Sequence, residues 1–369
     1  MTEQVVVLGA GYAGQLAARA AARTKDVTVT LVNDRDRFVE RVRLHQLAAG
    51  QELRDRPISD LVAGTGIRLV VDRATAIDHQ HKEVVLASGE SIGYDTLIYA
   101  LGSRADLESV PGAAEHADTV AGAEQAARLR DKLRDGGVVT VVGGGLTGIE
   151  AATELAESRP DLKVRLVTGD ALGERLSAKG RRYLHSAFSR LGIEVREHAA
   201  VTEVRPDGVV LADGEHVRSD TVVWTTGFRV PALAAEAGFA VDEHGRLIVD
   251  ETLRSVSHPD VYGVGDAAAG RMPGGQELRM ACATGLPAAQ QAAAAITARR
   301  AGREPKAFRF RYVNQCISLG RRDGLIQYVD RFDRPKEFVL TGRAAALYKE
   351  LVVRSAMQVQ RHPAIPTSF

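Results

Sequence analysis

The sequence predicts an α/β fold in which two Rossmann-like dinucleotide-binding domains are nested and a small α+β segment follows. Three features predict this fold class. Two short apolar runs each lead into a glycine-rich turn and a helix, one segment of the chain recurs, and a late Gly-Asp pair ends a further strand. The 369 residues correspond to about two and a half domains of ~150 residues each.

The composition limits the class of protein. With 45% hydrophobic residues and 48 Lys and Arg against 47 Asp and Glu, no strong field draws in nucleic acid, and we expect no nucleic-acid partner. The 36 glycines beside 5% aromatic residues indicate many tight turns or close approaches. Two cysteines, Cys282 and Cys316, cannot form a disulfide framework, and we expect no metal site and a cytoplasmic protein. The start of the sequence shows no signal-peptide pattern.

The first unit begins at residues 5–8, an apolar run that predicts a buried strand. It stops at Gly9, Gly11 and Gly14, which are spaced as GxGxxG, and an alanine-rich helix follows. In this motif the first glycine permits a tight turn, the second lets a pyrophosphate reach backbone N–H groups, and the third lets the helix pack on the strand. A second strand over residues 27–32 completes a βαβ unit.

The pattern recurs at residues 138–142, which lead into Gly143, Gly145 and Gly148 and then a helix that contains Glu150. The second strand of this unit is expected at residues 164–167. One such motif is weak evidence, because glycine-rich turns are common, but two in the same arrangement are much more specific.

An internal repeat supports the same interpretation. Residues 86–103 align without a gap on residues 211–228, and Leu, Ala, Gly, Glu, Asp, Thr and a late glycine coincide. Each copy predicts a hairpin followed by an apolar strand that ends at a glycine, Gly102 or Gly227. The chain therefore carries two copies of one nucleotide-binding design.

The order of these parts predicts nesting, with a chain crossing at Pro111-Gly112. A strand at 258–266 would return to complete the first unit. Phe308, Phe310 and Tyr312 alternate with arginines and predict a half-buried strand, and a last helix is expected over 342–357. The domains would be 1–108 (first part of the first nucleotide-binding domain), 109–229 (second nucleotide-binding domain), 230–300 (second part of the first domain) and 301–369 (C-terminal segment).

With the Gly265-Asp266 pair added, the sequence resembles the two-dinucleotide flavoproteins, which include type II NADH dehydrogenases, apoptosis-inducing-factor-like oxidoreductases and rubredoxin or ferredoxin reductases. The resemblance covers residues 1 to about 300 and implies a glutathione-reductase-like fold with FAD and NADH or NADPH as cofactors. It places FAD at Gly9, Gly11, Gly14, Asn33, Asp34, Arg43, Gly102, Gly265, Asp266 and Gly285, and the nicotinamide nucleotide at Gly143, Gly145, Gly148, Thr168 and Gly227.

The resemblance also suggests catalytic residues. Glu150 stands where type II NADH dehydrogenases have a glutamate near nicotinamide and flavin; alternatively, it is a solvent-facing glutamate in the first turns of a helix. Gln290 and Gln291 lie on the segment that corresponds to the helix beside the flavin and the quinone channel. Equally, they are polar residues on a helix packed within the protein.

Departures from the family pattern carry information about specificity. Where the pattern expects an acid for the ribose hydroxyls, this chain has Asn33 followed by Asp34, and in the second unit Thr168. No arginine follows Thr168 to hold a 2′-phosphate, so the sequence slightly favours NADH. No CxxxxC or CxxC pair is present, which disfavours disulfide reductase chemistry, and we expect Cys282 and Cys316 to be buried, inert thiols.

Hydride would therefore pass from nicotinamide to FAD, and electrons would continue to a small acceptor, most simply a quinone. Delivery to a ferredoxin or rubredoxin, a flavin-dependent biosynthetic oxidation, and an NAD(P)H-sensing module without turnover remain alternatives. The basic stretch over 299–311 suits a solvated linker, an acidic redox protein or an anionic lipid surface. An apolar stripe of Leu347, Tyr348, Leu351 and Val352 predicts packing on the same chain or in a homodimer, or a peripheral contact with the inner face of the membrane.

Overall fold

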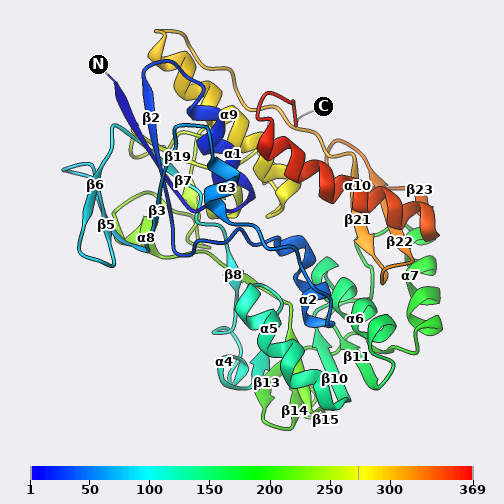
Figure 1. Ribbon diagram of the computed structural model, residues 1–369. Coiled ribbons are helices and arrows are strands. Elements are labelled where there is room, and N and C mark those ends of the chain that lie inside the picture. Colours follow the sequence, from blue (N-terminus) through cyan, green and yellow to red (C-terminus); the bar gives the residue numbers. More distant parts are fainter. Residues whose placement is uncertain (1, 273, 368–369) are drawn as a thin grey trace.

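The computed structural model describes residues 2–272 and 274–367, and its centre is a pair of five-stranded sheets (Figure 1). The first sheet has the order β19-β7-β1-β2-β3, and every neighbouring pair in it is parallel. Its strands are β1 (Glu3–Leu8), β2 (Val27–Asn33), β3 (Arg68–Val71), β7 (Thr96–Tyr99) and β19 (Val261–Gly263). Helix α1 (Tyr12–Ala21) connects β1 to β2, as the apolar run and the alanine-rich stretch predict.

The second sheet has the order β12-β11-β10-β16-β9 and is also parallel throughout. Helix α6 (Leu146–Ser158) connects β10 to β11, so the second βαβ unit forms where the sequence predicts it. The strands are β9 (Ala117–Asp118), β10 (Gly137–Val142), β11 (Leu162–Val167), β12 (Glu194–Arg196) and β16 (Thr221–Trp224); α5 (Ala123–Lys132) and α7 (Ala178–Arg190) are further helices of this unit.

The repeat is confirmed strand for strand. Each copy forms a three-stranded antiparallel hairpin sheet and then a strand that joins the parallel sheet at the same register, with Tyr99 opposite Leu8 and Trp224 opposite Val142. The hairpin strands are β4 (Ala74–Asp78), β5 (Glu83–Leu86) and β6 (Ser91–Gly93), and β13 (Val201–Arg205), β14 (Gly208–Leu211) and β15 (His216–Arg218).

The chain passes between the two sheets twice, and the two passages pair with each other. Strand β8 (Arg104–Ala105) on the way out is antiparallel to β17 (Phe228–Arg229) on the way back. Strand β19 then joins the first sheet beside β7, and α9 (Cys282–Arg300) packs along α1 (Figure 1). The predicted nesting is thus present, while the exact residues at which we divide the domains remain predictions.

Short elements complete the two units. They are 3-10 helices η1 (Arg41–Arg43), η2 (Leu133–Asp135) and η3 (Gly265–Ala267), helices α2 (Leu44–Ala48), α3 (Ile58–Val62), α4 (Ala113–His116) and α8 (Leu233–Glu236), and strands β18 (Leu247–Ile248) and β20 (Ala268–Ala269).

The C-terminal segment is an antiparallel sheet of β21 (Asn314–Ser318), β22 (Gly324–Val329) and β23 (Pro335–Thr341), followed by α10 (Gly342–Arg361). The strand predicted over Phe308 to Tyr312 is wrong. These aromatic side chains do alternate into the protein, and Phe308 and Tyr312 are buried, but their backbone belongs to none of the sheets formed by the described residues. Side-chain alternation reports burial, whereas a strand also needs a ladder partner.

Helix α10 buries the face opposite to its apolar stripe. Leu347 and Leu351 are 70% and 68% exposed, whereas Lys349 is buried. The buried face continues with Val353 and Met357, and Met357 belongs to the core of the first unit. The prediction that the stripe packs on its own chain is wrong, because the Lys349 side chain is drawn inward to an acidic partner on α6. Over residues 2–272 and 274–367, every helix is too short or too polar to cross a bilayer.

Candidate functional site

The first and third glycines of both turns are required by the fold itself. Gly9 has a φ of +96°, and a Cβ there would lie 2.6 Å from the Ala100 carbonyl oxygen. A Cβ on Gly14 would overlap the Gly9 carbonyl. In the second turn Gly143 has a φ of +119° and Gly148 meets the Gly143 carbonyl in the same way. Strand, turn and helix are in such close contact that no side chain fits.

The second glycines, Gly11 and Gly145, are different. Each precedes its helix with an ordinary extended backbone, at φ −69° and −73°, and a Cβ on either would meet no atom within 4 Å. Neither packing nor backbone conformation of the chain therefore calls for glycine. The open space lies at a helix N-terminus, where free N–H groups and the helix dipole favour phosphate. Both turns fit the pyrophosphate of a dinucleotide.

Asn33 supports the first turn from the end of β2. Its Oδ1 accepts a 2.8 Å hydrogen bond from the Ala10 N–H, and its Nδ2 donates to the Arg35 carbonyl at 2.8 Å. Asp34 is half exposed and paired with Arg35. In the second unit Thr168 is buried, and its Oγ1 lies 2.5 Å from where a Cβ on Gly144 would be. Both strand ends therefore carry an uncharged side chain against their turn.

Polar side chains cluster around the Gly265-Asp266 pair. The Ser103 hydroxyl donates a 2.7 Å bond to Asp266 Oδ2, and Arg41 Nη1 lies 3.2 Å from the Ser103 oxygen and 3.5 Å from Asp266 Oδ2. Gly102 has a φ of +68°, and a Cβ on it would have only Arg41 Nη1 within 4 Å, at 4.0 Å. An ion pair and an open glycine at the end of β7 suit a ligand with hydroxyls and phosphate.

Arg41 holds the position that the sequence analysis gave to Arg43. The Arg43 guanidinium instead turns toward α10 and donates a 2.8 Å bond to Glu350 Oε1. The reason is local: in the 3-10 turn Arg41–Arg43, alternate side chains leave on different sides. In this structure Arg41, rather than Arg43, is the residue beside Asp266, and a contact of Arg43 with FAD stays a prediction.

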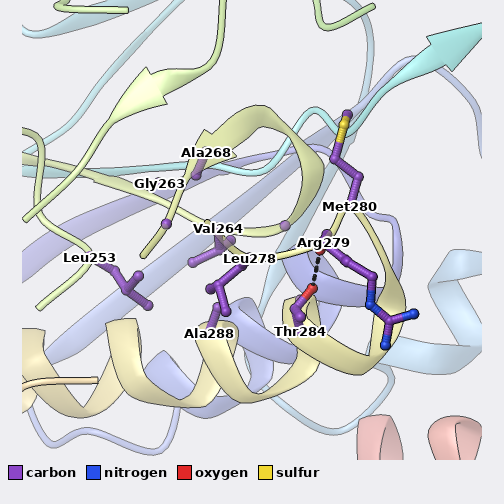
Figure 2. A pocket seen from close by; sticks show the side chains of 12 residues that line it. Leu253, Gly263, Val264, Ala268, Leu278, Arg279, Met280, Thr284 and Ala288 are labelled. Carbon is purple, nitrogen blue, oxygen red and sulfur yellow. Dashed lines mark hydrogen bonds between the residues drawn. The ribbon is translucent and has the colours of Figure 1, made fainter. Parts of the chain in front are cut away.

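The start of α9 meets the start of α1 at this point. A Cβ on Gly285 would lie 3.4 Å from the Gly265 Cα and 3.5 Å from the Ala13 Cβ. Thr284 holds the chain at the start of α9, because its hydroxyl donates a hydrogen bond to the Arg279 carbonyl at 2.7 Å (Figure 2). The cavity that Thr284 and Gly285 help to line is only about 10 Å³, the size of one water molecule. Two helix N-termini thus converge beside Asp266, as an anionic cofactor requires.

Glu150 is mostly covered rather than solvent-facing, with 13% of its side chain exposed. It forms an ion pair with the Lys349 ammonium of α10, and its Oε1 accepts a 3.0 Å bond from the Ser318 N–H of β21. His45 Nδ1, from α2, lies 4.0 Å from Glu150 Oε2. Four elements that are distant in the sequence therefore meet at this carboxylate, which agrees with the choice of Glu150 as a functional candidate.

Burial shifts the pKa values of this cluster toward neutral forms. Desolvation, with Arg43 nearby, lowers the pKa of Lys349 to about 7. Desolvation and the Lys349 charge also lower the pKa of His45 well below its ordinary value. Desolvation raises the pKa of Glu154, which bonds to Gln51 and whose Oε2 lies 3.9 Å from His45 Nε2. These shifts make Lys349 easier to deprotonate than an exposed lysine.

Gln290 and Gln291 take part in chain-to-chain contacts. Gln290 Nε2 donates to the Pro363 carbonyl at 3.0 Å and its Oε1 accepts from the Thr367 hydroxyl at 2.6 Å. Gln291 donates to the Lys306 carbonyl at 2.5 Å. The two amides hold the C-terminal tail and the linker after α9, and this placement supports the alternative that they are structural.

The remaining candidates are explained by the fold. Gly227, at φ +74°, sits at the β8–β17 crossing, where a Cβ would lie 2.9 Å from the Asp106 Cβ. Cys282 and Cys316 are partly exposed rather than buried, but desolvation raises the pKa of both thiols, that of Cys316 to about 12. Both are protonated at neutral pH. The described residues contain no cluster of metal-ligating side chains.

Two glycine turns that each fit a pyrophosphate, one in each βαβ unit, define a two-dinucleotide-binding protein. Residues 3–299 match the model of the pyridine nucleotide-disulphide oxidoreductase family, and the chain belongs to this family. Its cofactors are FAD and NAD(P)H, as is typical of that family. The protein is an oxidoreductase.

Known relatives cover most of the chain. An NADH dehydrogenase-like protein of Mycobacterium tuberculosis is 34% identical over 309 residues, 77% of this chain and 77% of the relative. The type II NADH:quinone oxidoreductase of Staphylococcus aureus is 26% identical over 387 residues, 95% and 94% of the two chains. The solved sulfide:quinone oxidoreductase of Aquifex aeolicus has a TM-score of 0.83 at 21% identity over 98% and 92%, a likeness in fold.

Sequence reasoning missed Lys349 and Ser103. Lys349 carried one signal, since a lysine lies between apolar residues on a helix, but that pattern also fits an exposed lysine. His45 and Ser103 stand in no motif, and only the tertiary fold brings them to Glu150 and Asp266.

Proposed function

We propose that this protein oxidises NADH and passes the electrons through FAD to a quinone. The observation that carries the proposal is the pair of glycines, Gly11 and Gly145, that nothing in the chain itself requires, with the buried Glu150–Lys349 pair reached from both units. Bound FAD supplies the redox chemistry, since it accepts hydride from a nicotinamide and returns electrons to an acceptor.

The residues of the chain hold and orient the two nucleotides. The N-terminus of α1 faces one pyrophosphate through Gly11, and that of α6 faces the other through Gly145. Asp266, fixed by Ser103 and Arg41, accepts a bond from a ribityl hydroxyl. Lys349 and Glu150 hold an exchangeable proton for reduction of the acceptor, because the Lys349 pKa of about 7 lies near the working pH.

NADH is favoured over NADPH at the second turn. Thr168 is uncharged and packed on Gly144, and the residues that follow it, Gly169 and Asp170, bring no positive charge for a 2′-phosphate.

A quinone acceptor is supported by the similarity to the Staphylococcus aureus relative, a type II NADH:quinone oxidoreductase. The exposed Leu347 and Leu351 on α10 add a surface that suits a peripheral membrane contact or a second copy of the chain. The two cysteines, protonated at neutral pH, do not favour thiol chemistry.

Steady-state assays of the purified flavoprotein test the proposal. NADH and NADPH are each combined with a short-chain quinone, oxygen and a ferredoxin. We expect the highest kcat/KM with NADH and the quinone. Turnover with ferredoxin alone, falling steeply with salt, would instead assign the chain to the iron–sulfur reductases, and the absence of turnover with every acceptor would leave the sensing function.

A further inference from the structure

A second pocket opens beside the Glu150–Lys349 pair, on the far side of Lys349. It has a volume of about 360 Å³ and lies between the Arg41–Arg43 turn, the loop after β21 and the first half of α10. This is ample for a small organic ligand. The two pyrophosphate turns do not line this pocket.

The pocket carries an excess of positive charge. Five cationic side chains line it and only one acid, Glu350. That acid is already paired, with Arg43 at 2.8 Å and with Arg354 at 2.8 Å. The lining cations are Arg43, Arg321, Arg322, Arg343 and Lys349.

Two of the arginines at the mouth have no acidic partner. Arg322 and Arg343 are exposed, and within the described part of the chain no carboxylate lies within 4.0 Å of either guanidinium. Arg343 also stands in the first turn of the 20-residue helix α10, where the helix dipole disfavours a positive charge. Two guanidinium groups without acidic partners that line one pocket are suited to an anion.

Part of the lining is apolar. Val42, Ala346, Leu347 and Val353 line the pocket, so a ligand would meet aliphatic carbon as well as guanidinium groups. At its inner end the pocket reaches Lys349, which is buried and bonded to Glu150.

We propose that this pocket binds a small organic anion, a carboxylate or phosphate monoester with an apolar body. The anionic group contacts Arg322 and Arg343, and the apolar body lies on Val42 and Leu347. The bound molecule touches Lys349 and so acts directly on the Glu150–Lys349 pair. The site does not depend on which acceptor the enzyme reduces.

Isothermal titration of the intact flavoprotein, without nicotinamide or acceptor, tests the site separately from the proposed function. The probes are 2-naphthoate, the uncharged 2-naphthamide of the same shape, and inorganic phosphate. We expect 2-naphthoate to bind about tenfold or more tightly than either of the other two, since a charge-assisted bond contributes about 1.5–3 kcal/mol.

The double substitution Arg322→Ala and Arg343→Ala should weaken 2-naphthoate binding about tenfold or more. Arg182→Ala, which removes an exposed arginine on α7, is the matched control and should leave the affinity unchanged. All of these positions are exposed, so the variants should keep the thermal stability of the parent. Equal affinity for 2-naphthamide or for phosphate, or unchanged 2-naphthoate binding in the double variant, would overturn the proposal.

Discussion

At the scale of single residues, the informative glycines are those that the protein does not need for itself. Gly9, Gly14, Gly143 and Gly148 are fixed by contacts within the chain, whereas Gly11 and Gly145 border open space. A side chain at one of the four constrained glycines would disrupt the fold. A side chain at Gly11 or Gly145 would interfere only with ligand binding.

This difference gives a paired prediction for the second turn. Gly145→Val should weaken NADH binding by tenfold or more, because the branched side chain enters the space of the pyrophosphate, and it should leave the melting temperature nearly unchanged. Gly148→Val should lower the melting temperature by several degrees or prevent folding, because its side chain overlaps the Gly143 carbonyl. Calorimetry and fluorescence titration measure both effects; equal loss of stability in the two variants would contradict the assignment.

The pKa of Lys349 predicts how activity depends on pH. Its pKa of about 7 is lowered by burial and by Arg43, so protonation of Lys349 is lost as the pH rises through neutrality. Arg43→Gln removes a positive charge and should move the inflection of the pH profile of kcat to higher pH. Glu150→Gln removes a negative charge from the other side and should move it to lower pH.

Arg43→Lys keeps the charge and serves as the control, with the inflection expected near that of the parent protein. An identical pH profile in Arg43→Gln and in the parent would show that Lys349 does not set the inflection.

At the scale of elements, two helices tie the nested units together. Helix α2 comes from the first unit, but Leu44 and Ala48 are buried in the core of the second. Helix α10 places Lys349 against α6, and further along Met357 joins the core around α1 (Figure 1). The Glu150 site lies where these two helices meet the second unit, so its geometry depends on the docking of both.

Shortening one buried side chain of α2, that of Leu44, tests this coupling. Leu44 is 1% exposed, and Leu44→Ala should destabilise the protein by about 2–4 kcal/mol. Denaturant unfolding is followed through Trp224, the one tryptophan of the chain, which is buried in the second unit. The exposed Leu347→Ala is the control, with an expected change within about 0.5 kcal/mol. A similar small change for Leu44→Ala would show that α2 does not stabilise the second unit.

The elements also show how much of the fold the sequence patterns predict. Both βαβ units and the repeated hairpins follow from local signals, namely apolar runs, glycine spacing and recurrence, and the structure has them all. The segment from Phe308 to Tyr312 and the stripe on α10 were misread, because alternation and helical period give the apolar face but not what lies against it. Lys349 is buried only because Glu150 is there to pair with it.

At the scale of the whole molecule, nesting joins two parallel sheets through paired crossing strands. Each parallel sheet has its own glycine turn, and the β8–β17 crossing joins the units near Gly102 and Gly227. Ligands of open α/β sheets bind at the carboxyl ends of the strands, so each unit offers one such site. The sequence could predict that both sites exist, but the residues between them, His45, Ser318 and Lys349, come from segments that no motif connects.

The most direct test of the proposed function is an anaerobic titration of the purified flavoprotein with NADH, followed by addition of a short-chain quinone. We predict that NADH bleaches the visible absorbance of the flavin at stoichiometric amounts, and that the quinone restores it within the turnover time. The Gly145→Val protein should keep its flavin but lose the bleaching. A flavin that neither NADH nor NADPH reduces, in a folded protein with FAD bound, would contradict the proposed function.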